Sequence, residues 1–266
     1  RCIGAFTILF LIVASRNFQS LKATRREIPT LALLGIVGFA AVQAGYFLGI
    51  QRGIPLSLVL IIEFTAPMWI VLWIKFVRKS VVAKDMWIAI ALSLLGLILV
   101  AKVWQGFAFD LIGSLGALGA ALALAVYFLM SQSQGTKRSA QAMIVWGFGV
   151  SGLFWSIVLP IWNFPTEIFT AEINLQGRFS EYSAPGWLLI AYIVVFGTMV
   201  PYLFVVGGIR RLSASTSSVI GMLEPVLAGV FAWIWLQQSW NGIQLLGAAV
   251  VLVGIYIADR ARSAAA

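Results

Sequence analysis

Residues 217–231 read SSVIGMLEPVLAGVF, an apolar run with a carboxylate and a proline, Glu224 and Pro225, at its centre. A proline inside a helix removes a backbone hydrogen bond and clashes with the carbonyl four residues earlier. An ionised carboxylate costs about 2.5–3.5 kcal/mol at the centre of a membrane. The pair therefore indicates a membrane-spanning helix interrupted for a functional reason. The alternative is a static bend with a protonated glutamate bonded to a freed carbonyl.

The composition of the whole chain supports a membrane environment. Of its 266 residues, 61% are hydrophobic and 10% are charged, against about 25% charged residues in a soluble domain. A membrane-spanning helix needs about 20 mostly apolar residues. Nine stretches fit or come close, and they predict an all-α polytopic membrane protein: 2–14, 30–51, 55–77, 86–102, 112–132, 141–162, 186–208, 214–236 and 241–258.

Two residue counts exclude several kinds of chemistry. The chain has one cysteine and no histidine, so an intrachain disulfide, a histidine metal site and a Ser-His pair are all ruled out. We expect no catalytic residues, no metal and no cofactor. The sequence begins with Arg1 in a short apolar run, and we expect a further span before it.

The basic residues alternate from loop to loop. The first, third, fifth, seventh and last connecting segments hold fourteen Lys and Arg residues, and the intervening loops hold only Arg52, Lys102 and Arg178. Basic loops stay in the cytoplasm. We therefore predict a plasma-membrane protein with a cytoplasmic C-terminus, and we interpret the net charge of +9 as a topology signal and not as nucleic-acid binding.

The chain contains an internal repeat. Residues 55–102 align without a gap to 213–260, and the alignment pairs Pro67 with Pro225 and Gly96 with Gly254. Five spans separate equivalent helices, so the second copy crosses the membrane in the opposite sense. Inverted repeats with interrupted helices are typical of secondary transporters, whose substrate sites lie near the midplane. We predict a first repeat at 1–107, lacking its first helix, and a second at 108–262.

Two stretches carry a resemblance to a known family. They are GIPLSLVLIIEFTAPMWIVLWIKF at 53–76 and residues 212–260 around GMLEPVLAGVF. Both resemble helices of EamA-type members of the drug/metabolite transporter superfamily, and EFTAP at 63–67 is similar to the pattern in its bacterial amino-acid exporters. The resemblance implies ten helices in two inverted five-helix repeats around a central cavity. An acidic residue often found after the ninth helix is absent from WLQQSW at 235–240.

Polar and aromatic residues inside the spans are the candidate site. An ionisable residue at membrane depth is a candidate for a substrate or ion pathway, which singles out Glu63 and Glu224. Pro67 and Pro225 are candidate hinges, with a static kink as the alternative. The spacing places Ser217, Gly221 and Glu224 on one helix face, which either lines a cavity or packs closely against a neighbour. Further candidates for the cavity wall are Gln43, Tyr46, Trp69, Tyr127 and Tyr202.

The sequence thus favours a secondary transporter that exports small metabolites, such as amino acids or related amphipathic compounds, by alternating access. Its partners would be the substrate and the lipid bilayer, with protons as one candidate coupling ion. An intramembrane lipid-modifying enzyme fits less well, because Asp85, Asp110 and Asp259 all lie near span ends. A membrane scaffold without transport activity is the third reading. Substrate, coupling, direction and oligomeric state stay open.

Overall fold

The computed structural model describes residues 1–105, 110–135 and 137–263. Within these ranges nine helical segments are long and apolar enough to cross a membrane, and they confirm an all-α polytopic membrane protein. The span expected at 141–162 ends at Val158, and the one expected at 241–258 continues to Ser263. The nine segments are Cys2–Leu21, Ile28–Gln51, Leu56–Val77, Lys84–Ala101, Leu111–Gly135, Ala140–Val158, Gly186–Arg211, Ala214–Leu236 and Gly242–Ser263.

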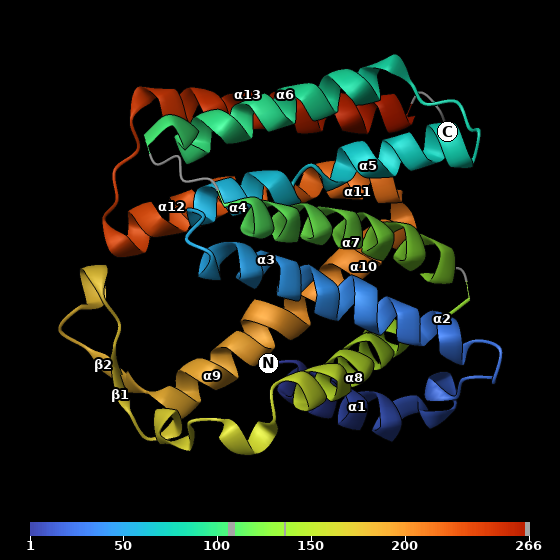
Figure 1. Ribbon diagram of the computed structural model, residues 1–266, viewed down its shortest axis with the longest axis vertical. Helices are drawn as coiled ribbons and strands as arrows, with labels where there is room; N and C mark the ends of the chain where they lie inside the picture. The colour runs from blue at the N-terminus through green and yellow to red at the C-terminus, as the bar shows by residue number, and fades with distance from the viewer. Residues whose placement is uncertain (106–109, 136, 264–266) are drawn as a thin grey trace. The chain divides into compact units, whose positions relative to one another are not determined.

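Several spans consist of consecutive shorter helices (Figure 1). The first half of the chain contains α1 (Cys2–Asn17), α2 (Ile28–Leu33), α3 (Val42–Gln51), α4 (Leu56–Glu63), α5 (Ala66–Leu72) and α6 (Lys84–Ala101). The second half contains α7 (Leu111–Gly135), α8 (Ala140–Val158), α9 (Gly186–Val194), α10 (Val200–Arg211), α11 (Ala214–Gly221), α12 (Glu224–Leu236) and α13 (Gly242–Ser263). π-Helical turns join α2 to α3 and α9 to α10. An antiparallel hairpin, β1 (Glu172–Asn174) and β2 (Ser183–Pro185), precedes α9.

The chain forms two compact units, and each contains segments from both sequence repeats. Unit 1 comprises residues 1–40 and 130–211. Unit 2 comprises residues 41–129 and 212–266. The predicted repeats and the compact units therefore do not coincide. Unit 2 takes α4–α6 from one repeat and α11–α13 from the other.

Unit 2 is built around the close pair α6 and α13, which lie side by side in Figure 1. A β-carbon placed on Gly96 would lie 2.6 Å from the carbonyl oxygen of Gly247 and 2.7 Å from the amide nitrogen of Val251. Small residues let helix backbones approach this closely in membranes. The two helices are antiparallel, because Gln244 donates to the carbonyl of Val100 at one end, at 3.1 Å.

The same contacts obey an approximate two-fold symmetry. The helices α4, α5 and α6 begin at residues 56, 66 and 84, and α11, α12 and α13 each begin 158 residues later. Adding the same offset to Gly96 gives Gly254, whose β-carbon would lie 2.9 Å from the carbonyl oxygen of Ala89 and 3.0 Å from the amide nitrogen of Ser93. Ala89 and Ser93 are in turn the equivalents of Gly247 and Val251. Each helix of the α6–α13 pair thus repeats the contacts of the other. An approximate two-fold axis produces this arrangement, and two inverted copies of one sequence repeat require such an axis.

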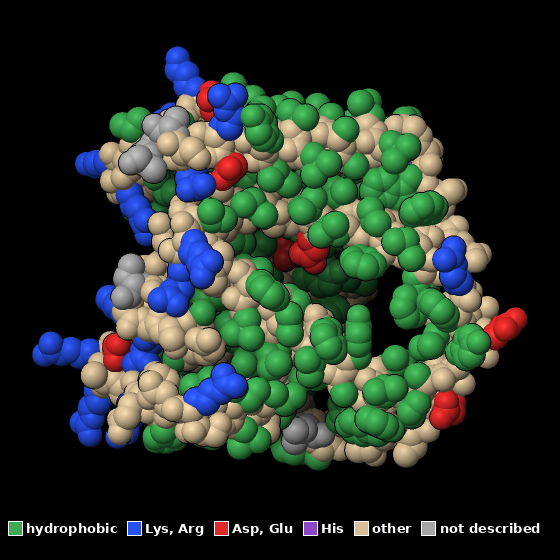
Figure 2. All heavy atoms as spheres, turned by 180° about the vertical axis from the view of Figure 1, so that it is seen from behind, with side chains coloured by type: hydrophobic (Ala, Val, Ile, Leu, Met, Phe, Trp, Pro, Cys, Tyr) green, Lys and Arg blue, Asp and Glu red, His purple; other side chains and the backbone are tan. Residues whose placement is uncertain are grey.

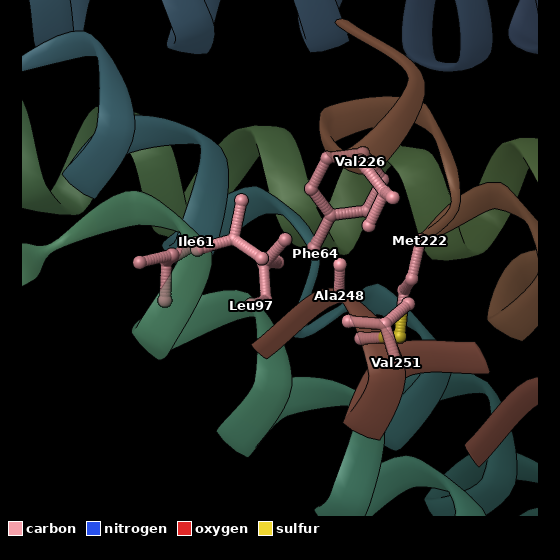
Figure 3. Close-up of a cluster of buried hydrophobic side chains, with 8 residues drawn as sticks. Ile61, Phe64, Leu97, Met222, Val226, Ala248 and Val251 are labelled. Atoms are coloured by element: carbon pink, nitrogen blue, oxygen red, sulfur yellow. The ribbon is translucent and has the colours of Figure 1, made fainter. Parts of the chain in front are cut away.

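Apolar side chains fix the interrupted spans of unit 2 to this helix pair. Phe64 and Met222 are repeat equivalents, each lies at a break between two helices, and both are buried in one cluster (Figure 3). The cluster also contains Ile61, Leu97, Val100, Val226, Ala248 and Val251. Burying side chains of this size stabilises by about 1.5–3 kcal/mol each in water. Within a membrane their contribution is close packing, which holds both breaks against the same surface.

Unit 1 contains a polar network at its basic loops. The guanidinium of Arg138 donates to the Glu27 carboxylate at 3.0 Å and to the carbonyl of Lys22 at 2.8 Å. The Trp146 indole donates to the carbonyl of Leu21 at 3.0 Å. These contacts, more than a hundred residues apart in sequence, fix the segment after α1 to the start of α8.

The pKa of Glu27 predicts how this network responds to acid. A hydrogen bond from the Thr24 backbone N–H, with further help from the Thr24 hydroxyl and Arg138, lowers that pKa from 4.5 to about 2. A lowered pKa contributes stability that is present above pH 4.5 and is lost as the pH falls toward the folded-state value. We expect Glu27→Gln to lower the melting temperature by the same amount at every neutral pH, and by progressively less below pH 4.5. Melting of purified protein at a series of pH values checks this, and a difference that grows on acidification would contradict it.

The outer surface is strongly apolar. Figure 2 shows hydrophobic side chains over most of the face in view. Large residues such as Phe204, Ile157 and Phe231 are more than 60% exposed in the spans. A soluble protein rarely exposes contiguous apolar patches of this kind, so this surface is suited to lipid.

Candidate functional site

Two spans of unit 2 are interrupted at corresponding positions. Helix α4 ends at Glu63 and α5 starts at Ala66, with Pro67 in its first turn. Helix α11 ends at Gly221 and α12 starts at Glu224, followed at once by Pro225. The sequence predicted kinks inside continuous helices, whereas the structure shows two separate half-helices in each span. Each proline is the second residue of its half-helix, in the first turn, where its missing N–H would have no helical partner in any case.

Side chains hold the first break in a defined shape. The hydroxyl of Thr65 donates to the carbonyl of Ile62 at 2.7 Å and accepts from the indole N–H of Trp69 at 3.1 Å. The Ile62 carbonyl also accepts from the Thr65 backbone N–H at 3.1 Å, so Thr65 closes a tight turn at the break. Trp69, predicted as part of a cavity wall, is half-buried and has this polar contact within its own span. Sequence reasoning missed Thr65, although its position three residues after Ile62 is the spacing of such a bond.

The two carboxylates lie close to each other at the breaks. Glu63 is the last residue of α4, Glu224 is the first of α12, and the pair is close enough for the two charges to interact. Glu63 is half-buried and Glu224 is exposed. Within the described residues neither carboxylate has a hydrogen bond or a basic partner. Figure 2 shows acidic side chains set among hydrophobic ones on the face in view.

A face of small and polar residues leads along α11 to Glu224. The residues between α11 and α12 form hydrogen bonds from Met222 to Val219 and from Leu223 to Ile220, which are the contacts of a tight 3-10 turn. Such a turn rotates about 120° per residue instead of about 100°. The extra rotation brings Glu224 closer to the direction of Gly221 than an unbroken helix would. Nothing lies within 4 Å of a β-carbon placed on Gly221, so this face is open beside the break.

Ser217 lies one turn before Gly221 on the same face. Its side chain is almost fully enclosed, with the residue 9% exposed. Its hydroxyl has no hydrogen-bond partner among the described residues. A buried hydroxyl without a partner costs about 1–3 kcal/mol, so the position favours a ligand or a water molecule that would satisfy it.

The remaining predicted wall residues are divided between the units. Gln43 and Tyr46 lie on α3 and Tyr127 on α7, all in unit 2. The Gln43 amide nitrogen is buried without a partner in the described part of the chain, and Tyr127 is 3% exposed. Tyr202 belongs to unit 1, where its ring packs 5.0 Å from the rings of both Phe39 and Phe148. Ser217, Gly221 and the two glutamates therefore all belong to unit 2, whereas Tyr202 belongs to unit 1.

The site has no arrangement for a metal ion. Across residues 1–105, 110–135 and 137–263, no three Cys, Asp or Glu side chains are grouped closely enough to bind one.

Within the described residues, the nine apolar spans make this a multi-pass membrane protein, and two of these spans consist of half-helices whose ends carry carboxylates. A sequence profile of the EamA-like transporter family matches residues 111–258. The chain belongs to the EamA-like transporter family.

Curated relatives are similar to this chain over most of its length, and a solved structure shares its fold. The uncharacterized transporter YdfC of Bacillus subtilis is 23% identical over 93% of this chain and 75% of its own length. The threonine/homoserine exporter RhtA of Escherichia coli K12 is 27% identical over 93% of this chain and 76% of its own. A solved crystal structure superimposes with a TM-score of 0.76 at 15% identity, covering 99% of this chain and 86% of that one, and shows a shared fold.

Proposed function

We propose that this protein is a secondary transporter of the plasma membrane that exports small metabolites, with amino acids or related amphipathic compounds as the substrates. The observation that carries the proposal is the pair of unpartnered carboxylates, Glu63 and Glu224, at breaks in corresponding spans of two inverted copies. Interrupted helices at membrane depth are tolerated where they line a cavity, and they form the substrate sites of many transporters. The similarity to RhtA supports amino acids as a substrate class.

The proposed mechanism is alternating access through a central cavity. Pro67 and Pro225 separate the half-helices on either side of each break, and such junctions can absorb a change of angle when a gate opens. Glu63 or Glu224 would bind a proton or a cationic group, and aromatic residues would take the apolar part of the substrate. The alternation of strongly and weakly basic loops supports a cytoplasmic C-terminus.

A transport screen tests this function. The purified chain, reconstituted in liposomes loaded with one unlabelled amino acid at a time, should accumulate the matching labelled compound by counterflow for at least one member of the panel. Empty liposomes are the control. A panel of amino acids, amines and organic acids that gives no counterflow at all, with the protein folded and inserted, would favour the membrane scaffold instead.

A further inference from the structure

The segment that connects α1 to α2 presents a cluster of basic side chains to the outside of unit 1. The first lies in the last turn of α1, and three more follow before α2 begins. All four residues are exposed, and within the described residues none of their side chains has an ion pair or a hydrogen bond. They are Arg16, Lys22, Arg25 and Arg26.

Arg25 and Arg26 form the tip of a closed turn. The Thr24 carbonyl accepts from the backbone N–H groups of Glu27 at 2.9 Å and Ile28 at 3.2 Å. In return, the Glu27 carboxylate accepts from the Thr24 backbone N–H at 2.9 Å and from the Thr24 hydroxyl at 2.8 Å. A hydrogen bond between the first and fourth residues closes a β-turn around its two central residues. The two arginine side chains therefore leave the turn from adjacent, fixed positions.

The protein holds this segment by its backbone and leaves its basic side chains outside. The side chain of Arg138 is 7% exposed, donates to the carbonyl of Lys22 at 2.8 Å and pairs with the Glu27 carboxylate at 3.0 Å. Leu21, just before Lys22, is buried. Glu27 is the only acidic residue between α1 and α2. Because its carboxylate is bonded to Arg138 and to the turn, it does not neutralise the two arginines.

The segment borders the apolar surface that is suited to lipid. Phe18, within the segment, and Ile28, which follows it, are both exposed. Exposed apolar side chains continue into the spans on either side, with Leu11 on α1 and Leu33 on α2 each more than half exposed. Lys and Arg residues clustered at the end of a membrane span attract anionic lipid headgroups.

Several cations of the other basic loops have a partner in the protein instead. Arg210 donates to the carbonyl of Gly135 at 2.9 Å, and Arg262 pairs with Asp259 at 3.0 Å. The Lys75 ammonium lies 5.5 Å from the centres of two aromatic rings. A role in membrane orientation alone requires basic residues in the loop, but it requires neither a fixed turn nor free guanidinium groups.

We propose that residues 16–26 bind the phosphate of an anionic phospholipid. Arg25 and Arg26 hold the phosphate oxygens, because the planar guanidinium group matches a phosphate with two parallel hydrogen bonds. Lys22 adds positive charge beside the phosphate, and Phe18 contacts the acyl chains. The proposal does not depend on the transport function.

The test counts the lipids bound to the purified full chain by native mass spectrometry from detergent. The two probes, palmitoyl-oleoyl phosphatidylglycerol and palmitoyl-oleoyl phosphatidylcholine, have the same acyl chains and differ in headgroup charge. We expect the first phosphatidylglycerol to bind at least about ten-fold more tightly than the first phosphatidylcholine, because each basic residue strengthens the attraction to an anionic lipid. Arg25→Gln combined with Arg26→Gln should remove this preference.

The matched control is Arg78→Gln combined with Lys79→Gln. It removes the same charge from two adjacent exposed residues of another basic loop, and it should keep the preference for phosphatidylglycerol. Melting curves show whether each variant is folded at the temperature of the binding measurement.

Glu27→Ala separates a shaped site from general electrostatic attraction. This variant makes the chain more positive, so attraction by net charge alone would strengthen phosphatidylglycerol binding. Since the variant also removes the acceptor that closes the turn, we expect phosphatidylglycerol to bind about three- to ten-fold more weakly.

Four results would overturn the proposal. The first is equal binding of the two lipids by the wild type, and the second is an equal loss of preference in the two double variants. The third is tighter phosphatidylglycerol binding by Glu27→Ala, which would indicate general attraction without a shaped site. The fourth is displacement of phosphatidylglycerol by an equal concentration of glycerol phosphate, which would make the turn a site for a soluble phosphate.

Discussion

Replacing Glu63 or Glu224 by Gln reduces transport in proteoliposomes by at least about ten-fold, with the melting temperature nearly unchanged. Glutamine has the same shape and can still hydrogen-bond, but it removes the charge that would attract a cationic group. Loss of a charge-assisted hydrogen bond costs about 1.5–3 kcal/mol, equivalent to about 10–100-fold in binding. If the two carboxylates bind the same ligand, the double variant should lose less than the two single losses combined predict.

The pH profile separates substrate binding from proton coupling. If one carboxyl carries the coupling proton, the corresponding glutamine variant also loses the pH dependence of transport between about pH 5.5 and 8. The control is Glu172→Gln in the hairpin, which makes the same chemical change at an exposed position outside the spans. Wild-type rates across this pH range in both Glu63→Gln and Glu224→Gln would remove the coupling role from these residues.

Gly96→Ala is expected to have the largest effect on stability. The new β-carbon would lie 2.6 Å from the carbonyl oxygen of Gly247 and 2.7 Å from a backbone nitrogen of Val251. Backbone atoms of a packed helix cannot move aside as the end of a flexible side chain can, so α6 and α13 must separate. Overpacking of this kind costs about 1–3 kcal/mol. Thermal melting of the purified variant, followed by size-exclusion chromatography, measures the loss.

Gly119→Ala is the matched control for that experiment. It makes the same change within a helix, but the new methyl group meets nothing within 4 Å. Alanine favours a helix over glycine by up to about 1 kcal/mol, so this variant should melt at the wild-type temperature or slightly above it. Equal melting of Gly96→Ala and Gly119→Ala would show that the close approach of α6 and α13 does not limit stability.

The spans and the repeat could be predicted from the sequence because both depend on local patterns. A run of about 20 apolar residues must span the membrane as a helix, and within the described residues all nine predicted runs begin within two residues of an observed span. The 158-residue offset found in the sequence returns in the starting residues of six helices. Because proline has no backbone N–H to donate within a helix, Pro67 and Pro225 likewise indicated where their spans would be interrupted.

Contacts between distant residues could not be predicted in this way. Nothing in the local sequence links Arg138 to Glu27, or places Tyr202 against Phe39 and Phe148. Nor could local patterns show that Glu63 ends one half-helix whereas Glu224 begins another. Helix termini are set by hydrogen bonding at single residues, and hydropathy averaged over a window does not record them.

The close contact between α6 and α13 also limits which substitutions related chains can accept. Gly96 rests on the backbone at Gly247, and Gly254 rests on the backbone at Ala89. A bulkier residue at any of these sites therefore requires a compensating change in the helix that faces it. In an alignment of related chains, the residue at position 96 should therefore vary together with the residue at 247, and the residue at 254 together with the residue at 89. The two halves of the chain would then limit each other's evolution.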